Sequence, residues 1–252
     1  MDVPAGPTVT VTFAGSGDAF GSGGRYQPCI HLRERDRPVV LLDCGATSLS
    51  ALKTLGLDPG EISTVFLSHL HGDHFGGLPF LILDGQFTRR TGPLTIAGPP
   101  GTGGRLRQAM EVMFPGSASV DRRFRLDVVE LSPGRTTTVT GVRVASWEVS
   151  HPSGAPSLAL RLGIGGKTIA YTGDTAWTDD LVAAAAGADL LIAEAYSFDK
   201  AIPYHLRHAD LAGHRSDLTS RRVVLTHLSA DMLARGDRLD FDAAYDGLTI
   251  GL

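Results

Sequence analysis

The chain contains little cysteine: only 2 of its 252 residues are Cys. Two thiols are too few for a disulfide framework, and Cys29 and Cys44 both lie in apolar, strand-like stretches. We expect packed, reduced thiols, which suit a cytoplasmic protein.

Signals for export or membrane insertion are also missing. The first residues, MDVPAGPTVTVTF, have neither the basic region nor the apolar core of a signal peptide, and no apolar run approaches membrane-spanning length. The sequence therefore predicts an unexported, cytoplasmic protein without a membrane partner.

Positive charge is in short supply as well. The chain has 23 Lys and Arg against 27 Asp and Glu, a formal net charge of -4. This balance argues against a general electrostatic attraction to nucleic acid, although a local basic rim around a cleft is compatible with it.

The chain is rich in alternating strand and helix patterns. Apolar, strand-like runs cover residues 8–15, 29–33, 38–45 and 63–69, and helical patterns follow near 77–90 and 101–114. Residues 126–172 are almost wholly strand-like, after which helices, one of them within 205–215, alternate with strands again. This order predicts one domain, 1–252, with two mixed sheets face to face and helices outside, a four-layer α/β sandwich.

The strongest motif is LSHLHGDHFGG, residues 67–77, directly after an apolar strand. It places His69, His71, Asp73 and His74 in the pattern H-x-H-x-D-H. In an extended turn, the first two imidazoles would point the same way and bind one ion, while the other two side chains reach a second. Imidazole and carboxylate are ligands for Zn²⁺ or a similar transition ion, with Mn²⁺ or Fe as alternatives.

Three further strands end in a side chain that can bind a metal. His151 follows SWEVS, Asp174 follows TIAYTG, and His227 follows RRVVLT. Because α/β sheets build their sites at the carboxyl ends of strands, we expect these residues to join the H-x-H-x-D-H loop at one edge.

With these motifs in that order, the chain resembles the metallo-β-lactamase-fold hydrolases along nearly its whole length. The resemblance implies an αββα sandwich and two divalent metal ions. One ion would take His69, His71 and His151, the other Asp73, His74 and His227, and Asp174 would bridge them. Two cations would lower the pKa of a bridging water and neutralise charge on the substrate.

The opening FAGSGDAFGSGGRYQPCI resembles the ribonuclease Z-like, phosphodiesterase branch of these hydrolases through Gly15, Gly17 and Arg25. A turn without ligand contacts is an equal alternative for this stretch. One departure concerns size: only 22 residues separate His151 from Asp174, where tRNA-processing members carry a long arm. The resemblance, together with this departure, therefore favours a small-molecule or nucleotide phosphodiester as substrate over pre-tRNA, and RNA is the less favoured alternative.

The segment YSFDKAIPYHLRHADLAGHRSD, residues 196–217, holds three more histidines. In the branch that the chain resembles, a glutamate at the position of Glu194 pairs with a downstream histidine that acts as proton donor. Since a helix after that strand should start near the metal edge and run away from it, His205 is favoured as the acid and His208 is the alternative. His214 is expected to be an ordinary helix-end residue.

The resulting prediction is a dinuclear metal-dependent phosphodiesterase with His205, Glu194 and Asp73 as catalytic candidates. A carboxylate partner should raise the pKa of the catalytic imidazole and fix its tautomer. Lactone, ester or thioester hydrolysis is the alternative within enzymes, and a non-catalytic accessory protein of cofactor biosynthesis is the alternative outside them. A homodimer is compatible with what the branch suggests.

Some residues near the predicted site are assigned other roles. Asp43 is either a turn former or a support for a metal ligand, and His31 is expected to face outward from an early strand. For the aromatic residues near the site, core packing is favoured over substrate stacking. These are Trp147, Trp177, Tyr196 and Phe198.

Overall fold

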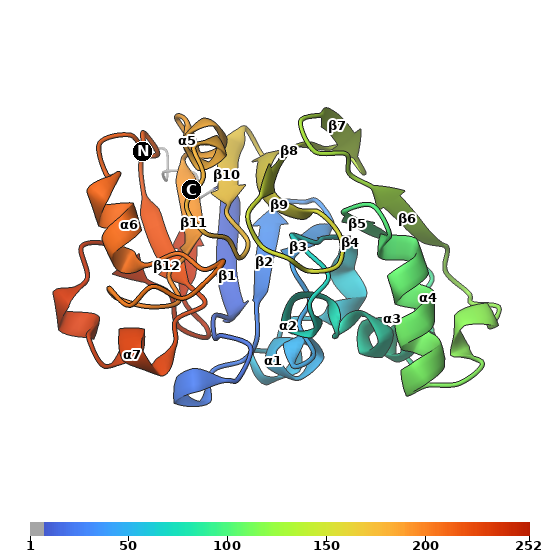
Figure 1. Ribbon diagram of the computed structural model, residues 1–252. Coiled ribbons are helices and arrows are strands. Elements are labelled where there is room, and N and C mark those ends of the chain that lie inside the picture. The colour runs from blue at the N-terminus through green and yellow to red at the C-terminus, as the bar shows by residue number, and fades with distance from the viewer. Residues whose placement is uncertain (1–7) are drawn as a thin grey trace.

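The computed structural model describes residues 8–252, which form two seven-stranded β-sheets packed face to face. Helices cover the outer face of each sheet and complete four layers (Figure 1). Both sheets contain parallel and antiparallel pairs, so the predicted αββα sandwich of two mixed sheets is confirmed.

The first sheet has the order β14-β1-β2-β3-β4-β5-β6. Its strands are β1 (Val9–Gly15), β2 (Cys29–Glu34), β3 (Val39–Leu42), β4 (Ile62–Phe66), β5 (Leu94–Gly98), β6 (Leu126–Glu130) and β14 (Thr249–Gly251). The helices of this half are α1 (Ser48–Thr54), α2 (Gly72–Phe75), α3 (Leu78–Phe87) and α4 (Thr102–Met113).

The second sheet has the order β13-β12-β11-β10-β9-β8-β7. Its strands are β7 (Thr136–Val139), β8 (Val142–Val149), β9 (Ser157–Ile164), β10 (Lys167–Tyr171), β11 (Leu190–Glu194), β12 (Val223–Thr226) and β13 (Asp242–Ala243). Its helices are α5 (Asp180–Ala185), α6 (His208–Gly213) and α7 (Ala230–Leu233). Single 3₁₀ turns lie at Ser22–Gly24, Pro59–Glu61, Ser117–Ser119 and Gly236–Arg238.

Side-chain alternation along the strands builds the core. On β1, Val9, Val11 and Phe13 point between the two sheets, while Ala14 belongs to the cluster under the outer helices. A third apolar cluster lies between the second sheet and α5 to α7. Both faces of each sheet are therefore buried along much of their length, which agrees with the apolar strands of the sequence.

Strand direction brings the carboxyl ends of several strands to one edge. β3, β4 and β5 run parallel in the first sheet, and β10, β11 and β12 run parallel in the second. The predicted ligands follow such strand ends, and this edge is the place where α/β sheets bind ligands.

The sequence analysis missed three short elements, α2, α7 and β13. Helix α6 begins at His208, so His205 lies in the loop before it and not on its first turn. Among residues 8–252, no helix is both long and apolar enough to cross a bilayer.

Candidate metal centre

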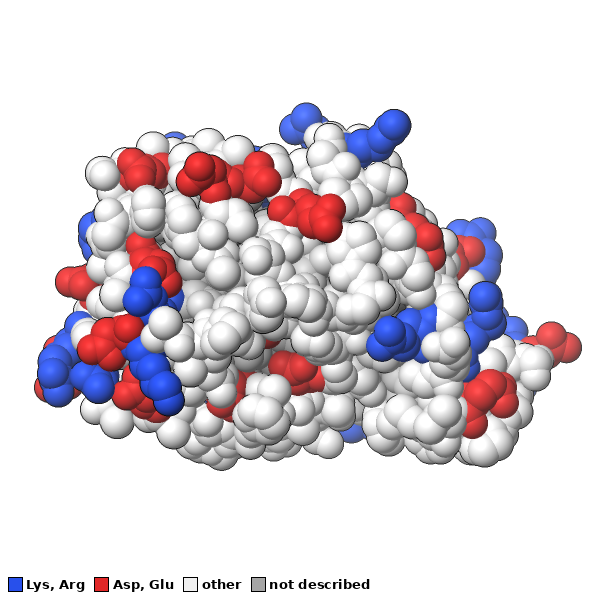
Figure 2. Space-filling model, viewed as in Figure 1, with Lys and Arg blue, Asp and Glu red and all other residues white. Residues whose placement is uncertain are grey.

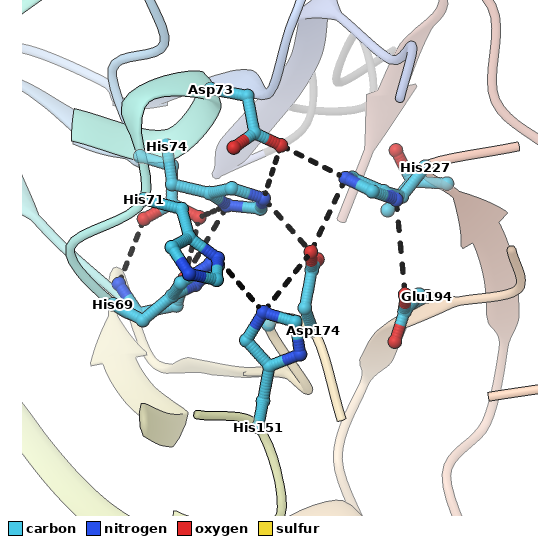
Figure 3. Close-up of polar contacts among 12 residues, drawn as sticks. His69, His71, Asp73, His74, His151, Asp174, Glu194 and His227 are labelled. Atoms are coloured by element: carbon cyan, nitrogen blue, oxygen red, sulfur yellow. Dashed lines mark hydrogen bonds and ion pairs between the residues drawn. The ribbon is translucent and has the colours of Figure 1, made fainter. Parts of the chain in front are cut away.

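The H-x-H-x-D-H motif forms a short loop and one turn of helix after β4. His71 caps the N-terminus of α2, and Asp73 and His74 lie within that helix. The sharp change from strand to helix turns the four side chains toward a common centre, as Figure 3 shows.

Three groups of potential ligand atoms meet at this centre, each with its atoms within 4.8 Å of one another. The first group is His69, His71 and His151; the second is Asp73, His74, Asp174 and His227; the third is Asp174, Glu194, His205 and His227. The first two groups match the two sets of ligands that the resemblance implies.

Asp174 lies between the two sets. Its Oδ1 is 3.2 Å from Nε2 of His74, and its Oδ2 is 3.4 Å from Nε2 of His227. The same Oδ2 lies 3.9 Å from Nε2 of His151, whose Nε2 in turn is 3.0 Å from Nδ1 of His71. One carboxylate therefore faces ligands of both sets, the placement that a bridging ligand requires.

Hydrogen bonds on the far side of three rings orient their Nε2 atoms toward the centre. Nδ1 of His74 donates to Oδ2 of Asp43 at 2.7 Å, and Nδ1 of His151 donates to the carbonyl of Tyr204 at 2.9 Å. Nδ1 of His69 lies 3.0 Å from the hydroxyl of Ser68. Such partners fix the tautomer and leave Nε2 free to bind a metal.

Asp43 is the common support of the motif loop. Its carboxylate accepts hydrogen bonds from the backbone and hydroxyl of Ser68, from His74 and from the phenol of Tyr171, which is 2.8 Å away. Of the two interpretations of Asp43, the support for a metal ligand is the one that the structure favours.

Backbone geometry at the site is unusual at two residues. Asp43 has φ 59° and His227 has φ 60°, in the left-handed region that non-glycine residues seldom adopt. Such conformations persist where the surrounding contacts enforce them, which is common at functional sites. Gly45 is required by packing, since a Cβ there would lie 2.0 Å from the carbonyl oxygen of Asp73.

The pKa values of the cluster reflect burial and the close packing of opposite charges. Burial lowers the pKa of His69 well below its usual value. Burial would also lower the pKa of His74, but the carboxylates around it, above all that of Asp174, outweigh burial and raise it. Conversely, burial would raise the pKa of Asp174, yet His227 and His74 hold it well below its usual range.

These donors fit divalent cations. Nε2 of His69 is buried and forms no hydrogen bond among the described residues, so its lone pair has no other use there. Buried carboxylates at Asp43, Asp73 and Asp174 gather negative charge that cations would neutralise. Nitrogen and oxygen donors in this number are typical of Zn²⁺ and related ions.

Glu194 and His205 form a direct hydrogen bond beside the metal ligands. Oε1 of Glu194 contacts Nδ1 of His205 and lies 3.8 Å from Nδ1 of His227. Its Oε2 accepts from the backbone of Thr175 at 2.8 Å and of Leu206 at 3.3 Å. The carboxylate thus orients His205 and is itself held by two backbone donors.

The expected rise in the pKa of His205 is wrong in direction. Burial lowers the pKa of His205, and burial together with Asp174 raises the pKa of Glu194 well above its usual value. Both shifts favour neutral partners that share one proton between Nδ1 and Oε1.

The other two histidines of that segment have different surroundings. His208 is buried, stacks on Phe198, and its Nε2 accepts from the backbone of Asp240 at 3.1 Å. His214 stacks on Trp177 with ring centroids 3.8 Å apart and pairs with Asp217. Neither belongs to the three groups of ligand atoms.

Other expectations from the sequence have mixed outcomes. His31 does not face solvent but is 2% exposed, and neither ring nitrogen has a hydrogen-bond partner among residues 8–252. Cys29 and Cys44 are free, buried thiols, as expected. Arg25 donates to the carbonyl of Ala244 at 2.7 Å and so closes the N-terminal loop onto β13.

Sequence reasoning missed several residues that support the site. Ser68 and Tyr171 hold Asp43, and the carbonyl of Tyr204 holds His151. Tyr171 could have been found because it ends β10, three residues before Asp174. A backbone carbonyl such as that of Tyr204 has no signal in the sequence.

Comparisons with known proteins show the family of the chain. The profile of the family described as anti-Pycsar protein Apyc1 matches residues 9–241. A ribonuclease Z of Methanosarcina acetivorans is 27% identical over 274 aligned residues, which cover 87% of each chain.

Two solved structures share the fold. Human tRNase Z, short form, has a TM-score of 0.78 at 27% identity and covers 96% of this chain and 98% of that one. The metallo-β-lactamase fold protein YhfI from Bacillus subtilis has a TM-score of 0.78 at 20% identity, covering 98% of this chain and 99% of that one.

Proposed function

The chain belongs to the family of the anti-Pycsar protein Apyc1, within the ribonuclease Z-like, phosphodiesterase branch of the metallo-β-lactamase fold, and from this premise we propose that it hydrolyses a small phosphodiester or nucleotide at a dinuclear metal centre. The observation that carries the proposal is the Glu194–His205 pair, which lies directly beside the two sets of metal ligands. Ester or lactone hydrolysis would not require such a proton donor.

Each part of the site has a role in this reaction. His69, His71 and His151 would hold one cation, and Asp73, His74 and His227 the other, with Asp174 between them. When bound, two divalent cations supply an activated water and neutralise charge that develops on the phosphoryl oxygens. Zn²⁺ suits the donor set best, and Mn²⁺ and Fe are the alternatives.

His205 provides the proton for the leaving group. As the oxygen of a water that has already released one proton to solvent bonds to phosphorus, the P–O bond to the leaving group breaks and the departing oxygen takes the proton from Nε2 of His205. Glu194 keeps the other proton at Nδ1, so the pair goes from neutral to singly negative. Proton transfer of this kind contributes about 10²- to 10⁴-fold to rate.

Two features support a small substrate over a folded RNA. Between His151 and Asp174, the chain forms a single hairpin, β9 and β10, which turns at Gly165 and Gly166. On the face in Figure 2, Lys and Arg side chains lie toward the sides and no continuous basic stripe crosses the middle. A long nucleic acid would be held by such a stripe.

The proposal is tested with purified protein loaded with Zn²⁺ or Mn²⁺ and assayed on a simple phosphodiester, a cyclic nucleotide, a lactone and a thioester. We expect turnover of the phosphodiesters, and loss of this activity alone in His205→Ala. His214→Ala, the same substitution in the same segment, is the matched control.

Other results would identify the alternatives. Turnover of only the lactone or thioester, with no effect of His205→Ala, would make the chain a carboxylic ester, lactone or thioester hydrolase. Tight metal binding without turnover of any of the four substrates would favour a non-catalytic accessory protein.

A further inference from the structure

The first set of ligands contains one residue from outside the motif loop. His69 and His71 follow β4 of the first sheet, whereas His151 lies in the loop 151–156 between β8 and β9 of the second sheet. Figure 3 shows His151 reaching the centre from a different segment of the chain than the other two histidines. The first set is therefore complete only if this loop places His151 against the other two rings.

Two linked hydroxyl groups fasten that loop. Oγ of Ser157 donates to the carbonyl of His151 at 2.6 Å, and Oγ of Ser153 lies 3.0 Å from Oγ of Ser157 and 3.0 Å from the carbonyl oxygen of Ala155. Because the Ser157 hydroxyl uses its single proton on His151, it can only accept from Ser153. The two serines are 2% and 5% exposed. Linked hydrogen bonds that are shielded from water in this way strengthen one another.

Ser157 is itself fixed by the sheet and not by its hydroxyl. It is the first residue of β9 and pairs with Val149 of β8. The next residue, Leu158, donates its backbone N–H to the carbonyl of Ser68 in the motif loop at 2.9 Å. The start of β9 thus lies between the two loops that carry the first set of ligands, and it gives the Ser157 hydroxyl a fixed position relative to both.

His151 has few other restraints. Its ring donates from Nδ1 to the carbonyl of Tyr204 at 2.9 Å, and its backbone N–H donates to the carbonyl of Val149 at 3.1 Å. Bonds between Zn²⁺ and an imidazole nitrogen are about 2.0–2.1 Å long, so a small shift of the loop moves the ring out of reach of an ion held by the other two histidines. The hydrogen bond on the His151 carbonyl opposes such a shift.

From these contacts we infer that Ser157 is a positioning residue for His151 and thereby sets the affinity of the first metal position, with Ser153 in support. The inference rests on the dinuclear centre of the proposed function. The second position is not involved, since among residues 8–252 neither serine forms a hydrogen bond with the side chains of the second set. Loss of a residue that supports a metal ligand lowers metal affinity by about 10- to 100-fold.

The inference is tested by titrating metal-free protein with Co²⁺ in a calorimeter. We expect two sites in the wild type. In Ser157→Ala, the affinity of one site should fall by about 10- to 100-fold and that of the other should stay unchanged. Ser153→Ala should have a smaller effect on the same site, because the hydrogen bond from Ser157 to His151 remains.

Two further variants separate positioning from general stability. Ser146 is a buried serine of β8 that donates to the carbonyl of Ser132 at 3.1 Å, so Ser146→Ala removes the same kind of hydrogen bond away from the ligands. It should lower Tm about as much as Ser157→Ala does and keep both Co²⁺ affinities. Ser157→Thr keeps the hydroxyl, in a strand that accepts β-branched residues, and should restore the affinity of the first position.

The readout is metal binding, so its outcome is separate from turnover. Wild-type affinities at both sites in Ser157→Ala, an equal loss at both sites, or a wild type that binds no Co²⁺ would each overturn the inference. A wild type that binds two ions, loses affinity at one site in Ser157→Ala and hydrolyses no phosphodiester would support the positioning role and contradict the proposed function.

Discussion

Two histidine-rich segments of this chain use their histidines in opposite ways. In residues 67–77, all three histidines and Asp73 converge on one centre. In residues 196–217, His205 lies beside the proposed metal ligands, His208 packs against Phe198, and His214 stacks on Trp177. Both segments contain three closely spaced histidines, but only in the first segment do all three face the proposed metal centre.

The difference arises from the backbone. The first segment turns from β4 into α2 within a few residues, so neighbouring side chains have no room to diverge. The second segment passes through a long loop before α6, and its three histidines lie in the loop, at the start of the helix and at its end. Short, sharply turned loops concentrate ligands, whereas longer ones distribute them.

The largest effect is expected where the first segment is broken. His69→Ala and Asp174→Ala should each remove bound metal and reduce phosphodiesterase activity by about a thousandfold or more, because each removes a ligand from a buried cluster of charges. Metal content by elemental analysis and kcat/KM are the measurements. A variant that kept both its metal and its activity would show that its side chain is not a ligand.

A smaller loss is expected from the second segment at His205. His205→Ala should lower kcat on phosphodiesters by about 10²- to 10⁴-fold with metal content unchanged, since the proton donor is lost and the ligands remain. Glu194→Gln should cost about 10- to 100-fold because it only disturbs the orientation of the ring. If His205→Ala lost metal as His69→Ala does, its role would be that of a ligand.

Part of the site can be predicted from the sequence. His151, Asp174 and His227 each follow a predicted strand, and parallel strands bring their carboxyl ends together, so these residues are expected at one edge. The sequence alone does not show that Asp43 supports His74, because an aspartate at a strand end forms turns as readily as it holds a metal ligand.

The sequence predicts helix boundaries less well than strand ends. It predicts His205 early in a helix, whereas α6 begins three residues later, at His208. The assignment of His205 next to Glu194 agrees with the structure, although a loop and not a helix delivers it. Long-range contacts such as the carbonyl of Tyr204 on His151 depend on the tertiary fold and have no local pattern.

His208→Ala should affect stability and not chemistry. The variant loses a buried ring that stacks on Phe198 and leaves the backbone N–H of Asp240 without its acceptor, which together destabilise by about 2 kcal/mol. Urea unfolding at pH 8 measures the loss, and kcat per folded molecule should stay within about twofold. A fall in kcat like that of His205→Ala would return His208 to the catalytic candidates.

The smallest effect is expected at His214. Its pair with Asp217 is exposed and contributes little, so His214→Ala should change kcat by less than about twofold. The ring also covers one face of Trp177, however, and aromatic pairs of this kind contribute about 0.5–1.5 kcal/mol. Loss of that cover should therefore lower the free energy of unfolding by about 0.5–1.5 kcal/mol, which urea unfolding measures, while kcat and KM on phosphodiesters stay within about twofold of the wild type. His214→Phe keeps a ring over Trp177 and should restore the stability of the wild type. A fall in kcat or a rise in KM beyond this range would mean that His214 acts on the reaction centre and not only on the packing of Trp177.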